Sequence, residues 1–317
     1  MKFYEHQTTY SSIRRKARQE YGRKFVDLSE EQFYTNSIRS TLGPGGVVGD
    51  PMCHNHACAE RAWIKSNKPY YKLWPGIAKS LLNLKLDIPV SMVKLPHQAL
   101  LIKLPEDQDF LGQDGFTCRT IVVAYGSKIK MNPVFPENSI SPNYKMIIVL
   151  SDWGERDQFD CPVYYVQQLH IADNTTVEDS IPPLVHPTAN VGLSLSIENR
   201  LNIVRLMAGV CLLGDDSELV KPEVLNRDQS KFMKTGDISL IDKAKKRGKY
   251  GFAIGDTSEV LPHYRNPHLC LVWTGEGKKI PRIVVRKGSI VKRKIATTIP
   301  SGYDMENNNG IGASVGE

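Results

Sequence analysis

Long hydrophobic runs are absent from this sequence of 317 residues, and their absence bears on where the protein works. No stretch approaches the roughly 18 consecutive apolar residues that a membrane-spanning helix needs. The opening segment, MKFYEHQTTYSSIRRKARQEYG, has no apolar run behind its charges and therefore lacks the pattern of a signal peptide. The sequence predicts a cytoplasmic protein that does not enter a membrane.

Cysteine is also scarce, with six residues in the whole chain. Cys118, Cys211 and Cys270 each lie inside an apolar run, which favours reduced thiols in a core over a disulfide framework. Hydrophobic residues make up 41% of the chain and charged residues 24%, which is typical of a globular protein rather than a disordered one. The length allows one large domain or two closely packed ones.

Acidic residues are few near both ends of the chain, so the positive charge is concentrated there. Residues 1–24 hold seven Lys and Arg against two acidic residues, and residues 243–294 hold fourteen against three. The intervening residues 25–242 hold twenty basic against twenty-six acidic residues. A localised excess of one sign favours binding to a polyanion, whereas the same charge spread evenly would mainly serve solubility.

The pattern of apolar residues predicts an α+β protein with a central antiparallel sheet, flanking helices and a C-terminal basic β region. Helical spacing occurs in residues 56–66 and 74–84 and again from Leu201 to Cys211, and Ser29 is placed to cap a further helix. Short runs rich in β-branched residues occupy positions 88–169. The first two, VSMVKL and ALLIKL, are close enough to form a hairpin that turns at Pro96-His97.

These segments group into four regions along the chain. Residues 1–87 combine a basic arm, a glycine-rich loop at 43–49 and helices, and residues 88–242 form the core, with the sheet and a pair of helices. Residues 243–303 make up the basic β region. The polar, glycine-rich residues 304–317 are expected to be a disordered tail.

A compact group of potential metal ligands follows the glycine-rich loop, in the segment Cys53-His54-Asn55-His56-Ala57-Cys58. Thiolate and imidazole groups are the ligands that zinc prefers, but Cys53, His54, His56 and Cys58 lack a second, distant pair that would complete a tetrahedral site. The alternative is structural, with Asn55 capping the following helix and the cysteines packed. We therefore expect no metal here and no other cofactor, since neither a Walker loop nor a dinucleotide-binding glycine pattern is present.

A second cluster presents two imidazoles and a guanidinium between prolines, in the segment Pro262-His263-Tyr264-Arg265-Asn266-Pro267-His268. Histidine exchanges protons near neutral pH and arginine grips phosphate, so His263, Arg265 and His268 are candidate catalytic residues for phosphodiester cleavage. A polar connection between strands is the structural alternative. The pattern P-H-x-R-x-x-H resembles a segment of uncharacterised bacterial and phage proteins, and this resemblance names no activity.

The basic C-terminal region supports the leading functional hypothesis, which is binding of nucleic acid or another polyanion. On a two-stranded ribbon alternate side chains share a face, so Arg282 and Arg286 line up while Ile283 and Val285 point the other way. Interleaved aromatics would stack on exposed bases. The candidate contact residues are Lys245, Lys246, Arg247, Lys278, Lys279, Arg282, Arg286, Lys292, Arg293 and Lys294.

Two other classes of function remain open at this point. The protein could be an enzyme that cleaves phosphodiesters with the His263, Arg265 and His268 loop, or a structural subunit whose basic ends contact an acidic protein partner. Retained binding without turnover would separate nucleic-acid binding from the enzyme. The oligomeric state is not readable from the residues.

Replacement of Lys292, Arg293 and Lys294 by Gln should weaken the salt dependence of nucleic-acid binding. Each phosphate contact releases counterions, so each lost contact should reduce the slope of log affinity against log salt by about 0.7 to 0.9. Titrations at several salt concentrations measure this slope. An unchanged slope and affinity would remove these three residues from the contact surface.

Overall fold

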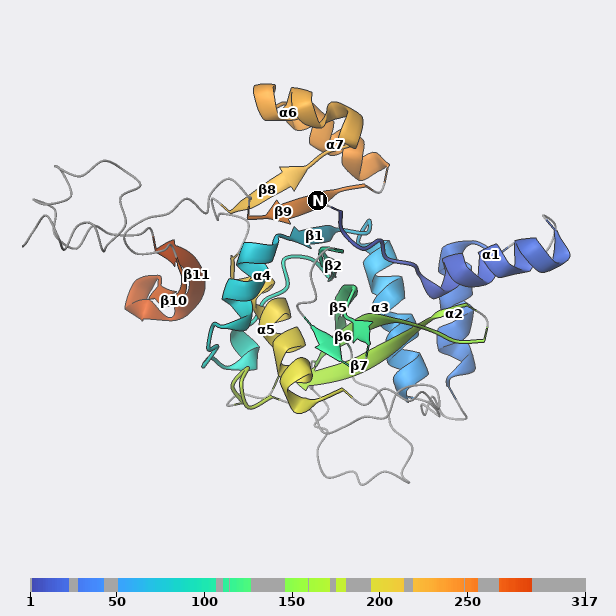
Figure 1. Ribbon diagram of the computed structural model, residues 1–317, viewed down its shortest axis with the longest axis horizontal. Helices are drawn as coiled ribbons and strands as arrows, with labels where there is room; N and C mark the ends of the chain where they lie inside the picture. Colours follow the sequence, from blue (N-terminus) through green and yellow to red (C-terminus); the bar gives the residue numbers. More distant parts are fainter. Residues whose placement is uncertain are drawn as a thin grey trace, which may run out of the picture.

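A sheet of seven strands forms the centre of the computed structural model, with helices on both of its faces (Figure 1). The strand order is β7-β6-β5-β2-β1-β9-β8. The structure describes residues 2–22, 28–42, 51–106, 111–113, 115–126, 146–158, 160–171, 175–180, 195–213, 219–247, 249–255 and 268–286. The seven strands are β1 (Tyr70–Leu73), β2 (Ala99–Lys103), β5 (Thr120–Gly126), β6 (Met146–Arg156), β7 (Pro162–His170), β8 (Val220–Glu223) and β9 (Gly251–Ile254).

The sheet is mixed, which corrects the prediction of an antiparallel sheet while the α+β class is confirmed. Strand β1 runs parallel to both β2 and β9, whereas the other neighbours in the sheet are antiparallel. The predicted hairpin at Pro96-His97 does not form, because VSMVKL contains a 3-10 turn at Val90–Met92 instead of a strand. Val90 and Val93 are buried although the backbone here is irregular. The apolar run therefore contributes to the core without pairing as a strand.

Two apolar layers lie on opposite faces of the sheet. On one face Leu100 and Ile102 of β2 pack in a core shared with α4 (Pro75–Leu82) and α5 (Ile197–Leu213). On the other face Ala99 and Leu101 pack with α3 (Pro51–Lys65). Because helices cover both faces, the central strands consist of nearly continuous apolar runs rather than alternating ones.

The N-terminal helices form a separate layer beside α3. Helix α1 (Thr9–Tyr21) begins at Thr8, whose side chain accepts a hydrogen bond from the Ser11 amide. Helix α2 (Glu30–Ser40) begins with a capping box in which Ser29 and Gln32 exchange hydrogen bonds, as predicted for Ser29. Asn55 is not a helix cap, because α3 begins at Pro51 and Asn55 lies in the interior of this helix, where its side chain is buried.

The basic segment after residue 242 divides between a helix and strands of two different sheets. Lys243, Lys245 and Lys246 lie on α7 (Ile238–Lys246), which packs with α6 (Gln229–Thr235) beside β8. Strand β9 then joins the central sheet next to β1. A separate antiparallel pair, β10 (His268–Thr274) and β11 (Ile280–Arg286), packs against α5 at another end of the molecule (Figure 1).

A second separate pair, β3 (Gly112–Gln113) with β4 (Phe116–Thr117), forms a short antiparallel turn. Residues 287–317 lie outside the described part of the chain, and with them the predicted tail at 304–317. In the described segments, no helix combines the length and hydrophobicity needed to cross a bilayer.

Substitution of Gly209 by Ala in α5 should destabilise the protein. In an exposed helix this change is favourable, but a Cβ at this position would lie 2.5 Å from the Leu81 side chain of α4. Overpacking of this kind lowers the unfolding free energy by about 1 to 3 kcal/mol. Denaturant titration of the variant and the wild type measures the change. The double variant Gly209→Ala with Leu81→Ala should be less destabilised than the sum of the single variants, and strict additivity would contradict this packing.

Candidate functional site

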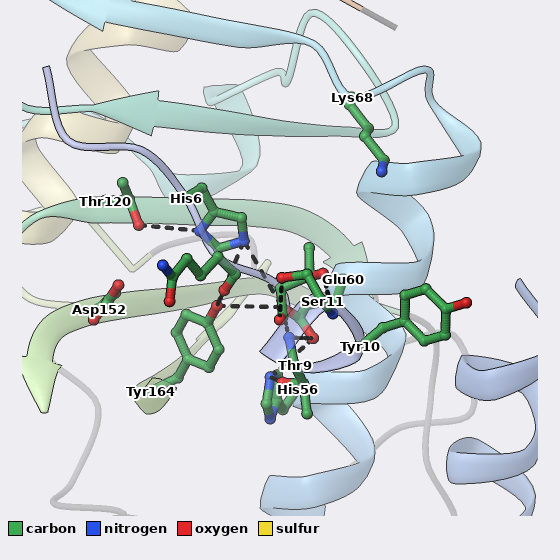
Figure 2. A network of polar contacts seen from close by, with 12 residues as sticks. His6, Thr9, Tyr10, Ser11, His56, Glu60, Lys68, Thr120, Asp152 and Tyr164 are labelled. Atoms are coloured by element: carbon green, nitrogen blue, oxygen red, sulfur yellow. Dashed lines mark hydrogen bonds and ion pairs between the residues drawn. The ribbon is translucent and has the colours of Figure 1, made fainter. Parts of the chain in front are cut away.

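A buried carboxylate, that of Glu60 on α3, is at the centre of the polar network in Figure 2. The Tyr34 hydroxyl donates a hydrogen bond to Glu60 Oε2 at 2.7 Å, and the Tyr164 hydroxyl donates to Oε1 at 3.2 Å. The backbone amide of Thr9 also donates to Oε1, at 3.2 Å. Four chain segments far apart in sequence therefore meet at one side chain.

Two histidines complete the surroundings of Glu60. His56 Nε2 lies 3.2 Å from Oε2, one helical turn before Glu60 on α3, and His6 Nε2 lies 3.7 Å from Oε1. His6 Nδ1 in turn lies 3.1 Å from the Thr120 hydroxyl on β5. The two imidazoles and the carboxylate thus join the N-terminal segment to both α3 and the sheet.

The network favours an ionised Glu60. Burial by itself raises the pKa of this carboxyl, but the adjacent His56 and His6 side chains outweigh burial and hold its pKa well below the usual range. Burial, together with the charge of Glu60, raises the pKa of Tyr34 and of Tyr164 far above that of free tyrosine. The tyrosines therefore stay protonated and can donate hydrogen bonds to Glu60, which connects the N-terminal segment to the sheet and helices.

The candidate ligands of the Cys53 to Cys58 segment lie on one helix and do not converge on a metal centre. No group of three or more His, Cys, Asp or Glu side chains suited to a metal occurs among the described residues. Instead, His54 Nδ1 lies 2.8 Å from the Thr41 hydroxyl, and burial lowers the pKa of His54. Burial raises the pKa of the Cys58 thiol to about 11, which makes it a poor nucleophile.

His56 is the member of that segment with a partner in the buried network. Its spacing of four residues from Glu60 on a helix is the sequence signal for this contact, because such residues lie on the same helical face. The contribution of His6 had no comparable signal, since it lies more than fifty positions away in the chain. Sequence reasoning therefore missed the network.

The predicted catalytic residues fall mostly beyond the described part. His263 and Arg265 lie outside the described residues, and His268 is the first residue of β10, where its backbone pairs with Arg286. Lys292, Arg293 and Lys294 lie outside them as well.

The remaining basic candidates occupy two separate places. Lys245, Lys246 and Arg247 are exposed at the end of α7, where the Lys245 ammonium lies 4.8 Å from the centre of the Tyr250 ring. Lys278, Lys279 and Arg282 are exposed on the β10–β11 hairpin. Figure 1 places α7 and this hairpin at different ends of the molecule, so the described cations of α7 and of the hairpin lie on separate surfaces.

A groove of about 580 Å³ runs along α1, which carries most of the basic charge of the N-terminal arm. Tyr10, Arg14, Arg15 and Arg18 from α1 line it, and Glu30 at the start of α2 lies on the other side. The Arg14 guanidinium lies 5.8 Å from the centre of the Tyr10 ring. The sequence indicated a basic arm here, but the groove appears only when α1 packs against α2.

Comparisons with known proteins assign no family. No family model and no curated protein matches the sequence. Among solved structures, the crystal structure of AcrVA2 aligns with 88% of this chain and 91% of that chain, at 15% identity and a TM-score of 0.43. At this identity and TM-score the likeness gives neither a class nor an activity to this chain.

Substitution of Glu60 by Gln should lower the unfolding free energy at neutral pH by about 3 to 5 kcal/mol, because it removes the charged partner of a buried polar network. A carboxyl whose pKa is depressed in the folded state stabilises the protein above its ordinary pKa and loses this effect as the pH falls through its folded pKa. The difference in unfolding free energy between the wild type and the Glu60→Gln variant should therefore become smaller in acid.

Denaturant titrations of both proteins across the acid range measure this difference. Glu31→Gln is the matched control, because Glu31 is 59% exposed and its ion pair with Lys65 lies at the surface. That control should change stability by less than about 0.5 kcal/mol. A Glu60 variant as stable as the Glu31 variant would show that the buried network does not stabilise the fold.

Proposed function

We propose that the protein binds nucleic acid through the β10–β11 hairpin. The observation that carries this proposal is the exposure, on one hairpin, of three cations, Lys278, Lys279 and Arg282, and of part of the aromatic ring of Trp273. Positive charge attracts the phosphate backbone, and an accessible aromatic ring supports stacking by an unpaired base.

The hairpin has one face toward the protein and one toward solvent. Leu269 and Ile283 are buried in the core shared with α5, whereas Arg282 is exposed on the opposite face. This alternation follows the pleat of the two strands and agrees with the expectation that Ile283 and Arg282 point in opposite directions. The hydrophobic face thus anchors the hairpin, and the cationic side chain is held at a defined position on a strand.

The turn between the strands presents the two lysines. Gly275 and Gly277 adopt positive φ angles of 76° and 69°, which glycine allows without steric cost, and Lys278 follows at 51°. Residues 268–286 carry four basic residues against one acidic residue, Glu276. The hairpin therefore carries a net positive charge in its sequence.

Trp273 is 40% exposed and Ile280, near it at the same end of the hairpin, is 52% exposed. Exposed large apolar side chains beside cations are typical of surfaces that bind single-stranded nucleic acid, where bases stack on aromatic rings. Single-stranded RNA or DNA is accordingly the favoured ligand. The α7 cations near Tyr250 would form a second, weaker contact region for a longer strand.

The cleavage alternative depends on His263 and Arg265 and stays a prediction of the sequence. An acidic protein partner would use the same cations but would not require Trp273 to stack. Substitution of Trp273 therefore distinguishes a nucleic-acid ligand from an acidic protein partner.

Replacement of Lys278, Lys279 and Arg282 by Gln should reduce affinity for a single-stranded oligonucleotide and lower the salt slope by up to about 2, because each phosphate contact on a single strand contributes about 0.7. Trp273→Ala should weaken binding by about tenfold or more without changing the slope, since stacking contributes about 1 to 3 kcal/mol per base and releases no counterions. Fluorescence anisotropy at several salt concentrations measures both quantities.

The matched control removes three exposed lysines elsewhere, Lys85, Lys94 and Lys234, and leaves the hairpin intact. If this control loses as much affinity and slope as the hairpin variant, binding reflects net charge alone and the hairpin is not the site. Wild-type protein that binds neither RNA nor DNA at low salt would refute the proposed function.

A further inference from the structure

Two arginines that line the α1 groove have no acidic partner among the described residues. Arg14 and Arg18 pair with no carboxylate of the described chain, whereas Arg15 pairs with Asp160. The Nε–H of Arg14 is buried and donates to no acceptor within the described residues. A guanidinium keeps its charge at all ordinary pH values, so two guanidinium groups in one groove attract an anion.

We infer that this groove binds a phosphate ester of nucleotide size. Arginine forms two parallel hydrogen bonds with phosphate oxygens, and Arg14 and Arg18 lie one helical turn apart on the same side of α1. The volume of about 580 Å³ lies within the range of sites for small molecules, which is about 300 to 1,000 Å³. The groove therefore accommodates a compact phosphorylated molecule.

The side chains around the α1 groove also offer contacts for the base and the sugar of a nucleotide. The Arg14 guanidinium rests over the Tyr10 ring, and the plane of a guanidinium is a surface on which a base can stack. Glu30 is already paired with the Lys68 ammonium at 2.8 Å, which reduces its repulsion of a phosphate. Its carboxylate can still accept a hydrogen bond from a sugar hydroxyl or an exocyclic amine.

The buried network makes the groove rigid before a ligand binds. Tyr34 donates a hydrogen bond to Glu60 and accepts one from the Tyr10 amide at 3.2 Å, and the Tyr10 hydroxyl donates to the Leu28 carbonyl at 2.8 Å. Tyr10 is thus held at both ends between α1 and α2. Since the first turn of α1 is fixed in this way, little ordering is required when the arginines bind an anion.

This site does not depend on the hairpin, which lies at the other end of the molecule in Figure 1. Isothermal titration of the full chain at low salt with adenosine diphosphate, inorganic phosphate and adenosine tests it directly. Adenosine diphosphate should bind more tightly than inorganic phosphate, and adenosine should bind weakly or not at all. Arg14→Gln and Arg18→Gln should each weaken binding of adenosine diphosphate by about tenfold, as expected for loss of a hydrogen bond to a charged group.

Arg18 is exposed, so its substitution tests the groove even if the Arg14 variant folds poorly. Arg18→Lys should recover part of the affinity but not all of it, because lysine keeps the charge without the paired donors. Arg39→Gln, an exposed arginine at the end of α2 outside the groove, is the matched control and should bind like the wild type.

The inference is overturned if adenosine diphosphate does not bind the wild type, if the Arg14 and Arg18 variants bind it unchanged, or if a glutamate hexapeptide binds more tightly. Inorganic phosphate that binds as tightly as adenosine diphosphate would also overturn it, because the groove would then contact no more than the anion. The hairpin variant lacking Lys278, Lys279 and Arg282 should keep its affinity for adenosine diphosphate. The experiments therefore distinguish failure of the α1 groove proposal from failure of the hairpin proposal.

Discussion

The buried carboxylate of Glu60 joins the N-terminal segment to α2, α3 and the sheet. It is buried on α3 and accepts hydrogen bonds from the Tyr34 and Tyr164 hydroxyls and the Thr9 amide, with two imidazoles beside it. A buried charge is costly unless its hydrogen-bonding capacity is used, so each of these partners is needed for the same reason. The contacts of the N-terminal segment with α3 and the sheet meet this requirement.

The two proposed binding surfaces differ in how they are supported. The α1 groove is built on the Glu60 network, because Tyr10 and Thr9 are fixed by hydrogen bonds that end at Tyr34 and Glu60. The β10–β11 hairpin is anchored by apolar packing of Leu269 and Ile283 against the core around α5. Loss of Glu60 should therefore disturb the groove while the hairpin keeps its support.

Much of the architecture could be predicted from residues that act locally. The capping box at Ser29 and Gln32, the helical spacing in α4 and α5, and the runs of β-branched residues in β5, β6 and β7 all depend on neighbours in sequence. The opposite orientation of Arg282 and Ile283 likewise follows from the period of a strand. Strand β1 was not predicted, and the strand predicted in VSMVKL is replaced by the 3-10 turn at Val90–Met92.

The sequence by itself determined that the chain folds as an α+β protein and that its cations gather near both ends, because composition and periodicity require no knowledge of contacts. Only the tertiary structure decided that β1 is parallel to its neighbours, that the cations of α7 and of the hairpin are separated, and that His6 and His56 meet at Glu60. Each of these features joins residues that are far apart in the chain. Their proximity is set by burial of apolar faces and by satisfaction of a buried charge, which depend on the whole fold.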